Sequence, residues 1–172
     1  MLGVTLLFNE PPDAHQPEIR WRLYRFKSGE VLKKPLYLHK RSCYLVGREG
    51  RVADITTAHP SCSNQHTVIQ YRLVAKEQAD GLISKQARPY LMDLSSTNGT
   101  FINHNRLEPQ CYYELLEKDT SRFGNSRYDS YILLHRIYLS LCLQQHQTHD
   151  RFSFIKFLYG LTPSLCYDSK RH

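Results

Sequence analysis

Long hydrophobic runs are missing from this chain of 172 residues. The longest apolar stretches, around residues 137–143 and 152–161, are too short and too interrupted to cross a bilayer. The opening residues, MLGVTLLFNEPPDA, have no basic residue before their apolar run and no small-residue cleavage site, so they make a poor signal peptide. The sequence therefore predicts a soluble protein with no membrane contact.

Paired cysteine motifs are missing as well. The cysteines are odd in number, scattered, and contain no C-x-x-C pattern, so neither a disulfide scaffold nor a zinc site is indicated. This usage fits a reducing intracellular compartment. The five cysteines are Cys43, Cys62, Cys111, Cys142 and Cys166.

Motifs for catalysis and for nucleotide binding are equally absent. The sequence contains no P-loop, no Gly-rich turn from a strand into a helix, and no G-x-S-x-G elbow. His146 and His149, next to Asp150, lie in a Gln-rich patch without a third ligand at a suitable spacing, so we expect no metal. We predict a protein that is not an enzyme and needs no cofactor.

Acidic residues are outnumbered by basic ones, 16 to 23, which gives a formal net charge of +7. A surplus of this size favours anionic partners, although it also serves solubility when it is spread over a surface. RNA contact is therefore a secondary hypothesis, because the sequence does not indicate the exposed aromatic ladder on which bases stack.

What the chain does have, from residue 20 onward, is a series of short runs rich in Tyr, Leu, Ile and Val, separated by turn residues. No long segment repeats its hydrophobic residues at helical spacing. Such a pattern predicts an all-β sandwich with binding loops at one end. The expected strands are WRLYRF, PLYLH, CYLVG, HTVIQYRLV, PYLMDL, GTFIN, YYELLEKD and SYILLH.

Glycine-containing pairs at residues 28–29, 80–81 and 98–99 are hairpin or turn signals, since glycine tolerates positive φ. The polar segment VAKEQADGLISKQARP is centred on the second pair and predicts a long exposed hairpin, which we interpret as a solvated loop and not as a partner surface. We expect an N-terminal leader at 1–19, one domain at 20–135, and an irregular C-terminal extension at 136–172.

Three polar clusters between the expected strands carry the chemistry of phosphate binding. They are Gly47-Arg48, the serine-to-histidine run at 63–66, and SSTNGT at 95–100. An arginine can make a forked, charge-assisted bond to phosphate oxygens, and short hydroxyl side chains in nearby loops can complete the cradle. Glycine before the arginine would let another segment approach the backbone.

In order, type and spacing these clusters resemble the forkhead-associated (FHA) domain, a phosphothreonine-binding module with a β-sandwich fold. The resemblance implies that Arg48, Ser63 and Thr97 contact the phosphate, and that Asn64 and Asn98 hold the peptide main chain. It also implies that the residues supporting the site are Gly47, His66, Gly99 and Asn103.

Plainer interpretations exist for the same residues. Arg48 alone could be an ordinary surface arginine, and Asn98-Gly99 alone would make a good hairpin turn. A serine three residues before His66 suggests a catalytic pair, but a hydrolase also needs an orienting acid and an oxyanion hole. We expect His66 to be a buried structural histidine, and Asp93 to brace a loop and not to act as an acid catalyst.

Further segments resemble the Smad nuclear-interacting protein family, which includes the fungal pre-mRNA leakage protein. They include RWRLYRFKSGEVL, HPSCSNQH and RLEPQCYYELLEKDT, and the resemblance runs over about residues 9–135. It implies a protein of the nucleus that binds phosphothreonine-containing proteins and splicing-complex proteins as part of the retention-and-splicing complex. A basic RNA-binding domain and a phosphate-independent scaffold of the spliceosome remain the alternatives.

Overall fold

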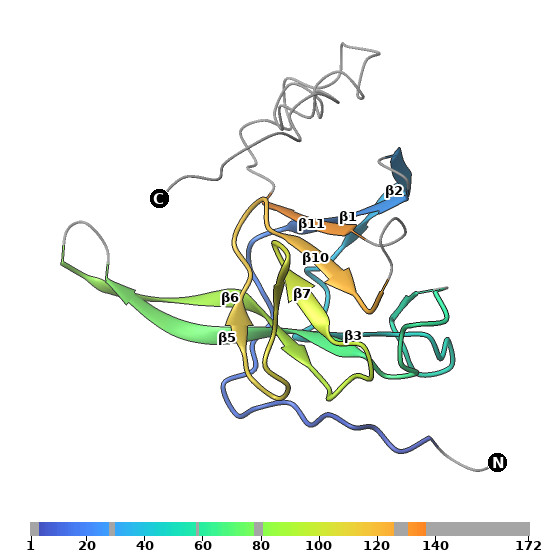
Figure 1. Ribbon diagram of the computed structural model, residues 1–172. Coiled ribbons are helices and arrows are strands. Elements are labelled where there is room, and N and C mark those ends of the chain that lie inside the picture. The colour runs from blue at the N-terminus through green and yellow to red at the C-terminus, as the bar shows by residue number, and fades with distance from the viewer. Residues whose placement is uncertain (1–3, 28–29, 58, 78–80, 126–130, 137–172) are drawn as a thin grey trace, which may run out of the picture. The chain divides into compact units, whose positions relative to one another are not determined.

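The computed structural model describes residues 4–27, 30–57, 59–77, 81–125 and 131–136, and in these ranges the chain forms eleven strands and no helix. The strands make a six-stranded sheet in the order β2-β1-β11-β10-β7-β8 and a five-stranded sheet in the order β4-β3-β5-β6-β9 (Figure 1). The predicted all-β sandwich is confirmed. The strands are β1 (Trp21–Lys27), β2 (Glu30–Tyr37), β3 (Cys43–Gly47), β4 (Ile55–Thr56), β5 (Thr67–Glu77), β6 (Ile83–Asp93), β7 (Thr100–Ile102), β8 (Asn105–Arg106), β9 (Tyr113–Glu114), β10 (Thr120–Phe123) and β11 (Tyr131–Arg136).

Alternation along the central strands builds the main core. Successive side chains of a strand point to opposite faces of its sheet. In β3, Tyr44 and Val46 belong to the large buried cluster, whereas Leu45 between them belongs to a second cluster. The large cluster consists of Trp21, Leu23, Leu38, Tyr44, Val46, Ile55, Cys62, Ile69, Tyr71, Leu91, Leu107, Leu115 and Phe123.

The second cluster gives the five-stranded sheet another apolar face. It contains Leu45, Val68, Met92 and Leu94, and Phe8 from the N-terminal segment packs against it. The segment expected to be a leader therefore lies against the sheet. Further along the same segment, the Leu73 amide donates to the Asp13 carbonyl at 2.9 Å, and Asp13 forms an ion pair of 2.8 Å with Arg72.

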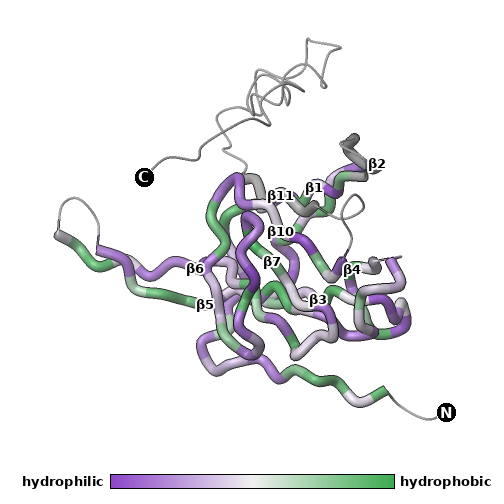
Figure 2. Tube along the Cα trace, in the orientation of Figure 1, coloured by the Kyte–Doolittle hydropathy of each residue, from purple (hydrophilic) through white to green (hydrophobic). Residues whose placement is uncertain are grey.

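A long hairpin joins β5 and β6, as the polar segment around residues 80–81 predicts. The two strands pair over their whole length, from Thr67 opposite Asp93 to Glu77 opposite Ile83. In its outer half, β5 is more hydrophobic than β6 (Figure 2). Gly81 adopts a φ of +78°, the conformation for which a glycine is needed.

Asn98-Gly99 lies in a bent loop and not in a hairpin turn. It lies between β6 and β7, and these strands belong to different sheets, so the plainer interpretation of this pair as a hairpin is wrong. Glycine is still required, because Gly99 has a φ of +78°. The loop carries the chain from one sheet to the other at the end where Gly47 and His66 also lie.

The chain divides into the units Met1–Ile137 and Tyr138–His172. The second unit, with His146, His149 and Asp150, lies outside the described residues, as does the Ser28-Gly29 pair. Lys27 and Glu30, on either side of that pair, are backbone partners in the antiparallel β1–β2 ladder. In the described part of the chain, no helix is long and apolar enough to span a bilayer.

Candidate phosphate-binding site

Arg48 directly follows β3 and is held by its backbone against the loop before β5. Its amide donates to the carbonyl of Ser63 at 3.0 Å. The exposed guanidinium donates through Nη2 to the Asn64 side-chain oxygen at 3.3 Å, a long hydrogen bond. The strand end therefore fixes the base of the side chain while the cationic end faces solvent next to Asn64.

Gly47 allows another segment to approach its backbone closely. A Cβ atom placed on Gly47 would overlap the carbonyl oxygen of Asn64. That carbonyl accepts a hydrogen bond of 3.1 Å from the Glu49 amide, so the two loops are joined next to the glycine. Any side chain at residue 47 would push the Ser63-Asn64 loop away from Arg48.

His66 ties the binding loops together from a fully buried position, with an exposed fraction of 0%. Its Nδ1 accepts a hydrogen bond of 3.1 Å from the Ser63 amide, and its Nε2 lies 3.2 Å from the Gly99 carbonyl oxygen. Because Nδ1 faces a donor and Nε2 faces an acceptor, the ring is neutral and carries its proton on Nε2.

This arrangement argues against a serine–histidine catalytic pair. The ring nitrogen next to Ser63 is occupied by the Ser63 backbone amide and not by its hydroxyl. The hydroxyl oxygen instead lies 3.2 Å from the Thr97 amide, from which it accepts a hydrogen bond. His66 is therefore not placed to take a proton from Ser63, which is the first requirement of a general base.

Thr97 lies in the loop between β6 and β7 and brings a third element to the site. Its amide bond to the Ser63 hydroxyl places a backbone N–H and a hydroxyl side by side at the surface. Arg48 is connected to these two groups by its hydrogen bonds to the Ser63 carbonyl and the Asn64 side chain. The three loops that follow β3, β4 and β6 thus bring one cation and one hydroxyl donor to the same end of the sandwich, with the Thr97 amide holding the hydroxyl in place. A cation and a hydroxyl donor are groups suited to phosphate oxygens.

Asp93 braces the third loop from below. The carboxylate is 1% exposed and accepts hydrogen bonds from the Ser96 amide at 2.9 Å and from the hydroxyls of Ser96 and Thr100, both at 2.6 Å. A buried carboxylate with three hydrogen-bond donors has its acceptor positions satisfied and holds the start and the end of the loop together. The geometry is that of a brace.

Comparison with known proteins agrees with this geometry. The FHA domain family model matches residues 44–124, which contain all three clusters. The chain belongs to the FHA domain family. The FHA domain-containing protein DDL of Arabidopsis thaliana is 64% identical over 133 residues, which are 77% of this chain and 42% of that protein. Mouse Smad nuclear-interacting protein 1 is 54% identical over 133 residues, 77% of this chain and 34% of that protein.

Two solved structures of yeast Pml1 share the fold, and the match covers nearly the whole of each Pml1 chain. One, described with its integration into the RES complex, has a TM-score of 0.63 at 28% identity and covers 76% of this chain and 97% of that chain. The full-length Pml1p structure has a TM-score of 0.62 at 30% identity, covering 76% and 99%. The resemblance to this subgroup is confirmed. The present chain matches less than half the length of the two curated relatives above.

Asn98 is part of a bracing network in this FHA domain. Its side-chain nitrogen donates to the Ser61 carbonyl at 2.8 Å, and its side-chain oxygen accepts from Asn125 at 3.2 Å. The Asn125 amide also donates to the Ser61 hydroxyl at 3.0 Å. Ser61 and Asn125 were missed in the sequence because each lies outside the three clusters and is a common loop residue. Contact between Asn98 and a bound peptide stays a prediction.

Gly99 is a junction of the same network. Its carbonyl accepts hydrogen bonds from both His66 Nε2 and the Gly124 amide, the latter at 2.9 Å. Gly124 adopts a φ of +61° and passes so close to Ser61 that a Cβ would lie 2.6 Å from the Ser61 hydroxyl oxygen. Gly124 is thus a further supporting residue that sequence reasoning missed.

Asn103 stands apart from the other predicted supporting residues. It has a φ of +47° in the β7–β8 turn, and its side chain bonds Asp119 at 2.6 Å and the Thr120 amide at 2.9 Å. These bonds join the β7–β8 turn to the turn before β10, at the end of β7 that is farther from Thr97. Its support of the loop that carries Thr97 is therefore indirect, through the placement of β7.

Acid should weaken the fold through His66. Burial lowers the pKa of its ring below the usual 6.5, because a charged imidazole is poorly solvated there, although Asp93 and the Gly99 carbonyl act in the opposite direction. Since the unfolded chain takes up this proton first, the His66 contribution is fully present above about pH 6.5 and is lost as the pH falls below that value.

The measurement is urea unfolding of wild type and of His66→Gln between about pH 7.5 and about pH 5.5, a range that spans the ordinary histidine pKa. We expect the stability gap between the two proteins to narrow at the acid end, with a slope of at most about 1.4 kcal/mol per pH unit. The comparison removes titrations that both proteins share. A gap that stays constant with pH would contradict the assignment.

Proposed function

We propose that this FHA domain binds phosphothreonine-containing proteins and serves a nuclear factor of pre-mRNA splicing. The observation that carries the proposal is the convergence of Arg48, the Ser63 hydroxyl and the Thr97 amide on one end of the sandwich, joined by bonds of 3.0 Å from the Arg48 amide to the Ser63 carbonyl and 3.2 Å from the Thr97 amide to the Ser63 hydroxyl. In the described residues, no group of three or more His, Cys, Asp or Glu could hold a metal ion.

The phosphate would be held by charge and by directed donors. Arg48 supplies the positive charge, and a guanidinium can bond two phosphate oxygens at once. The Ser63 hydroxyl can rotate to donate to a third oxygen while it still accepts from Thr97, since a hydroxyl has one donor and two acceptor positions. Asn64 lies beside Arg48 and has an exposed amide that can reach the main chain of a bound peptide.

The proposed setting rests on the named relatives. Yeast Pml1 is described as a splicing factor that integrates into the RES complex, and the mouse relative is named a Smad nuclear-interacting protein. A further relative, 33% identical over 120 residues, is the human nuclear inhibitor of protein phosphatase 1. We therefore propose the nucleus as the location, splicing-complex proteins as partners, and binding without catalysis as the activity.

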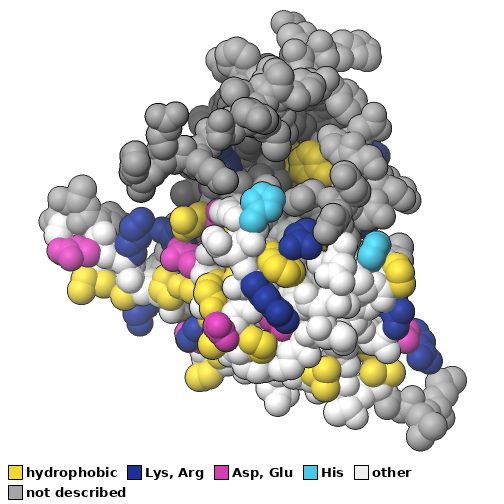
Figure 3. All heavy atoms as spheres, viewed as in Figure 1, with side chains coloured by type: hydrophobic (Ala, Val, Ile, Leu, Met, Phe, Trp, Pro, Cys, Tyr) yellow, Lys and Arg dark blue, Asp and Glu magenta, His cyan; other side chains and the backbone are white. Residues whose placement is uncertain are grey.

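RNA binding is a weaker candidate. On the face seen in Figure 3, basic and hydrophobic side chains lie together over β7 and β10. Arg122 lies 3.9 Å from the centroid of the Phe101 ring, and Arg22 lies 5.4 Å from that of Tyr37. These rings each have one face covered by a guanidinium, whereas stacking of bases requires open ring faces.

The decisive experiment compares three peptides of one sequence that carry phosphothreonine, phosphoserine or unmodified threonine. We expect the phosphothreonine peptide to bind several-fold more tightly than the phosphoserine peptide, because burial of one methyl group contributes about 0.8 kcal/mol. The unmodified peptide should show the weakest binding, since it offers no charge to Arg48. Isothermal titration calorimetry measures all three affinities.

Each rival function gives a different pattern in the same experiment. Equal binding of the phosphorylated and unmodified peptides would favour the phosphate-independent scaffold. Binding of a short single-stranded RNA that does not displace the phosphopeptide, with RNA affinity unchanged in Arg48→Ala, would favour RNA binding on another surface. Equal affinity for phosphothreonine and phosphoserine would leave a phosphate site but remove the threonine preference.

A further inference from the structure

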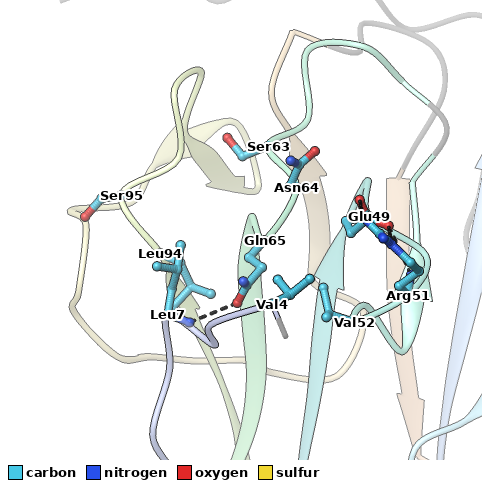
Figure 4. Close-up of a pocket in the computed structure, with 10 residues that line it drawn as sticks. All are labelled: Val4, Leu7, Glu49, Arg51, Val52, Ser63, Asn64, Gln65, Leu94 and Ser95. Atoms are coloured by element: carbon cyan, nitrogen blue, oxygen red, sulfur yellow. Dashed lines mark hydrogen bonds and ion pairs between the residues drawn. The ribbon is translucent and has the colours of Figure 1, made fainter. Parts of the chain in front are cut away.

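A pocket of about 450 Å³ opens beside the proposed phosphate site, and part of its wall comes from the N-terminal segment. Ser63 and Asn64 lie on one side of it, and Val4 and Leu7 lie on the other (Figure 4). Its volume is within the range of about 300 to 1,000 Å³ that is typical of ligand pockets. None of the predicted phosphate contacts comes from the N-terminal segment.

Gln65 holds that wall in place. Its side-chain nitrogen donates to the Thr5 carbonyl at 2.8 Å, and its side-chain oxygen accepts from the Leu7 amide at 2.9 Å. The Gln65 side-chain amide thus makes the donor and acceptor bonds that a neighbouring strand would make with the N-terminal segment. Gln65 is only 7% exposed and directly follows Asn64, so the N-terminal wall and the phosphate site are fixed by the same loop.

The pocket lining combines four apolar side chains with polar ones. Val4, Leu7, Val52 and Leu94 supply the hydrophobic surface. Val4 is 43% exposed and Leu7 is 60% exposed, so much of this surface faces solvent in the free protein. Among the polar lining residues, Arg51 pairs with Glu49 at 2.9 Å, and the two charges offset one another.

We propose that this pocket receives an apolar side chain of the same peptide whose phosphothreonine is bound by Arg48 and Ser63, so that the N-terminal segment Val4–Phe8 helps to set the sequence preference. The inference rests on the proposed function. A peptide is the expected occupant because Ser63 and Asn64 belong to both the pocket and the phosphate site. An aliphatic side chain is favoured because it would cover apolar surface and meet no unpaired charge among the lining residues.

The test is a positional scan of phosphothreonine peptides in which each flanking position is varied among alanine, leucine and aspartate. For wild type we expect one position to prefer leucine over alanine by roughly three- to tenfold, the effect of burying a good part of one aliphatic side chain. In the double variant Val4→Ser, Leu7→Ser this preference should disappear, while the ratio of phosphorylated to unmodified peptide affinity stays unchanged.

Leu6→Ser is the matched control. Leu6 lies in the same segment and is 58% exposed, but it does not line the pocket, so its variant should keep the wild-type preference. A scan with no preferred position in wild type, or the same preference in the double variant, would overturn the inference and leave phosphothreonine binding intact. If wild type binds no phosphothreonine peptide, the proposed function fails and the pocket proposal fails with it.

Discussion

Replacement of Arg48 by alanine should weaken phosphothreonine peptide binding by tenfold or more without unfolding the domain. Hydrogen bonds to charged groups contribute about 1.5 to 3 kcal/mol each, and about 1.4 kcal/mol corresponds to a factor of ten in affinity. The side chain is exposed, and its bond of 3.3 Å to Asn64 is long, so its removal costs the fold little. Calorimetry with the folded variant gives the affinity directly.

Two further variants separate charge from geometry. Arg48→Lys keeps the positive charge but loses the forked donor pair, so it should fall between wild type and Arg48→Ala. Arg41→Ala removes an arginine before β3, whose side chain is 66% exposed and paired with Asp54, and it should leave affinity nearly unchanged. Equal losses in Arg48→Ala and Arg41→Ala would mean that the domain attracts the peptide through its general positive charge and that Arg48 has no special role.

The fold class could be predicted from the sequence because the central strands show it strongly. The runs CYLVG and HTVIQYRLV alternate between two buried clusters, and each became a strand of the five-stranded sheet. Two of the missed strands, β4 and β8, have only two residues each. At that length no alternation is visible, and a strand exists because a neighbouring strand pairs with it.

The strand expected over YYELLEKD was too long, and β10 was not predicted. Of the run YYELLEKD, only Tyr113 and Glu114 are in a strand, because the chain then turns and Asp119 accepts a hydrogen bond of 2.8 Å from the Leu116 amide. The following strand, β10 (Thr120–Phe123), is polar apart from its last residue. It is fixed by pairing with β7 and β11, which a local pattern cannot reveal.

The residues of the candidate site were recognisable because the three clusters lie in loops that the sandwich brings to one end. What the sequence could not show is which partners those residues use. Ser61 lies far along the chain from Gly124 and Asn125, and the bonds of all three to the Asn98-Gly99 loop exist only after the sheets have packed. The contribution of Val4 and Leu7 to a pocket depends in the same way on Gln65, whose side chain reaches about 60 residues back along the chain.

The second large effect is expected from His66→Ala, which should destabilise the domain by about 3 kcal/mol or more. The ring is fully buried, packs edge to face against Phe123 at a centroid distance of 5.8 Å, and bonds both the Ser63 amide and the Gly99 carbonyl. Removal would leave a cavity, and the Ser63 amide would lose its partner at a cost of about 1 to 3 kcal/mol, although the Gly99 carbonyl would keep its bond from the Gly124 amide. Chemical denaturation of both proteins measures the difference.

Ser63→Ala is the matched comparison, because it removes the hydroxyl of a residue that His66 contacts only through the backbone. We expect its stability to remain within about 1 kcal/mol of wild type, the usual range for one partly exposed hydrogen bond. Its phosphopeptide affinity should nevertheless fall, since the Thr97 amide loses its anchor and the phosphate loses a donor. We thus expect His66→Ala to lower mainly the stability and Ser63→Ala to lower mainly the affinity. A Ser63→Ala protein that unfolds more readily than His66→Ala would refute this division of roles.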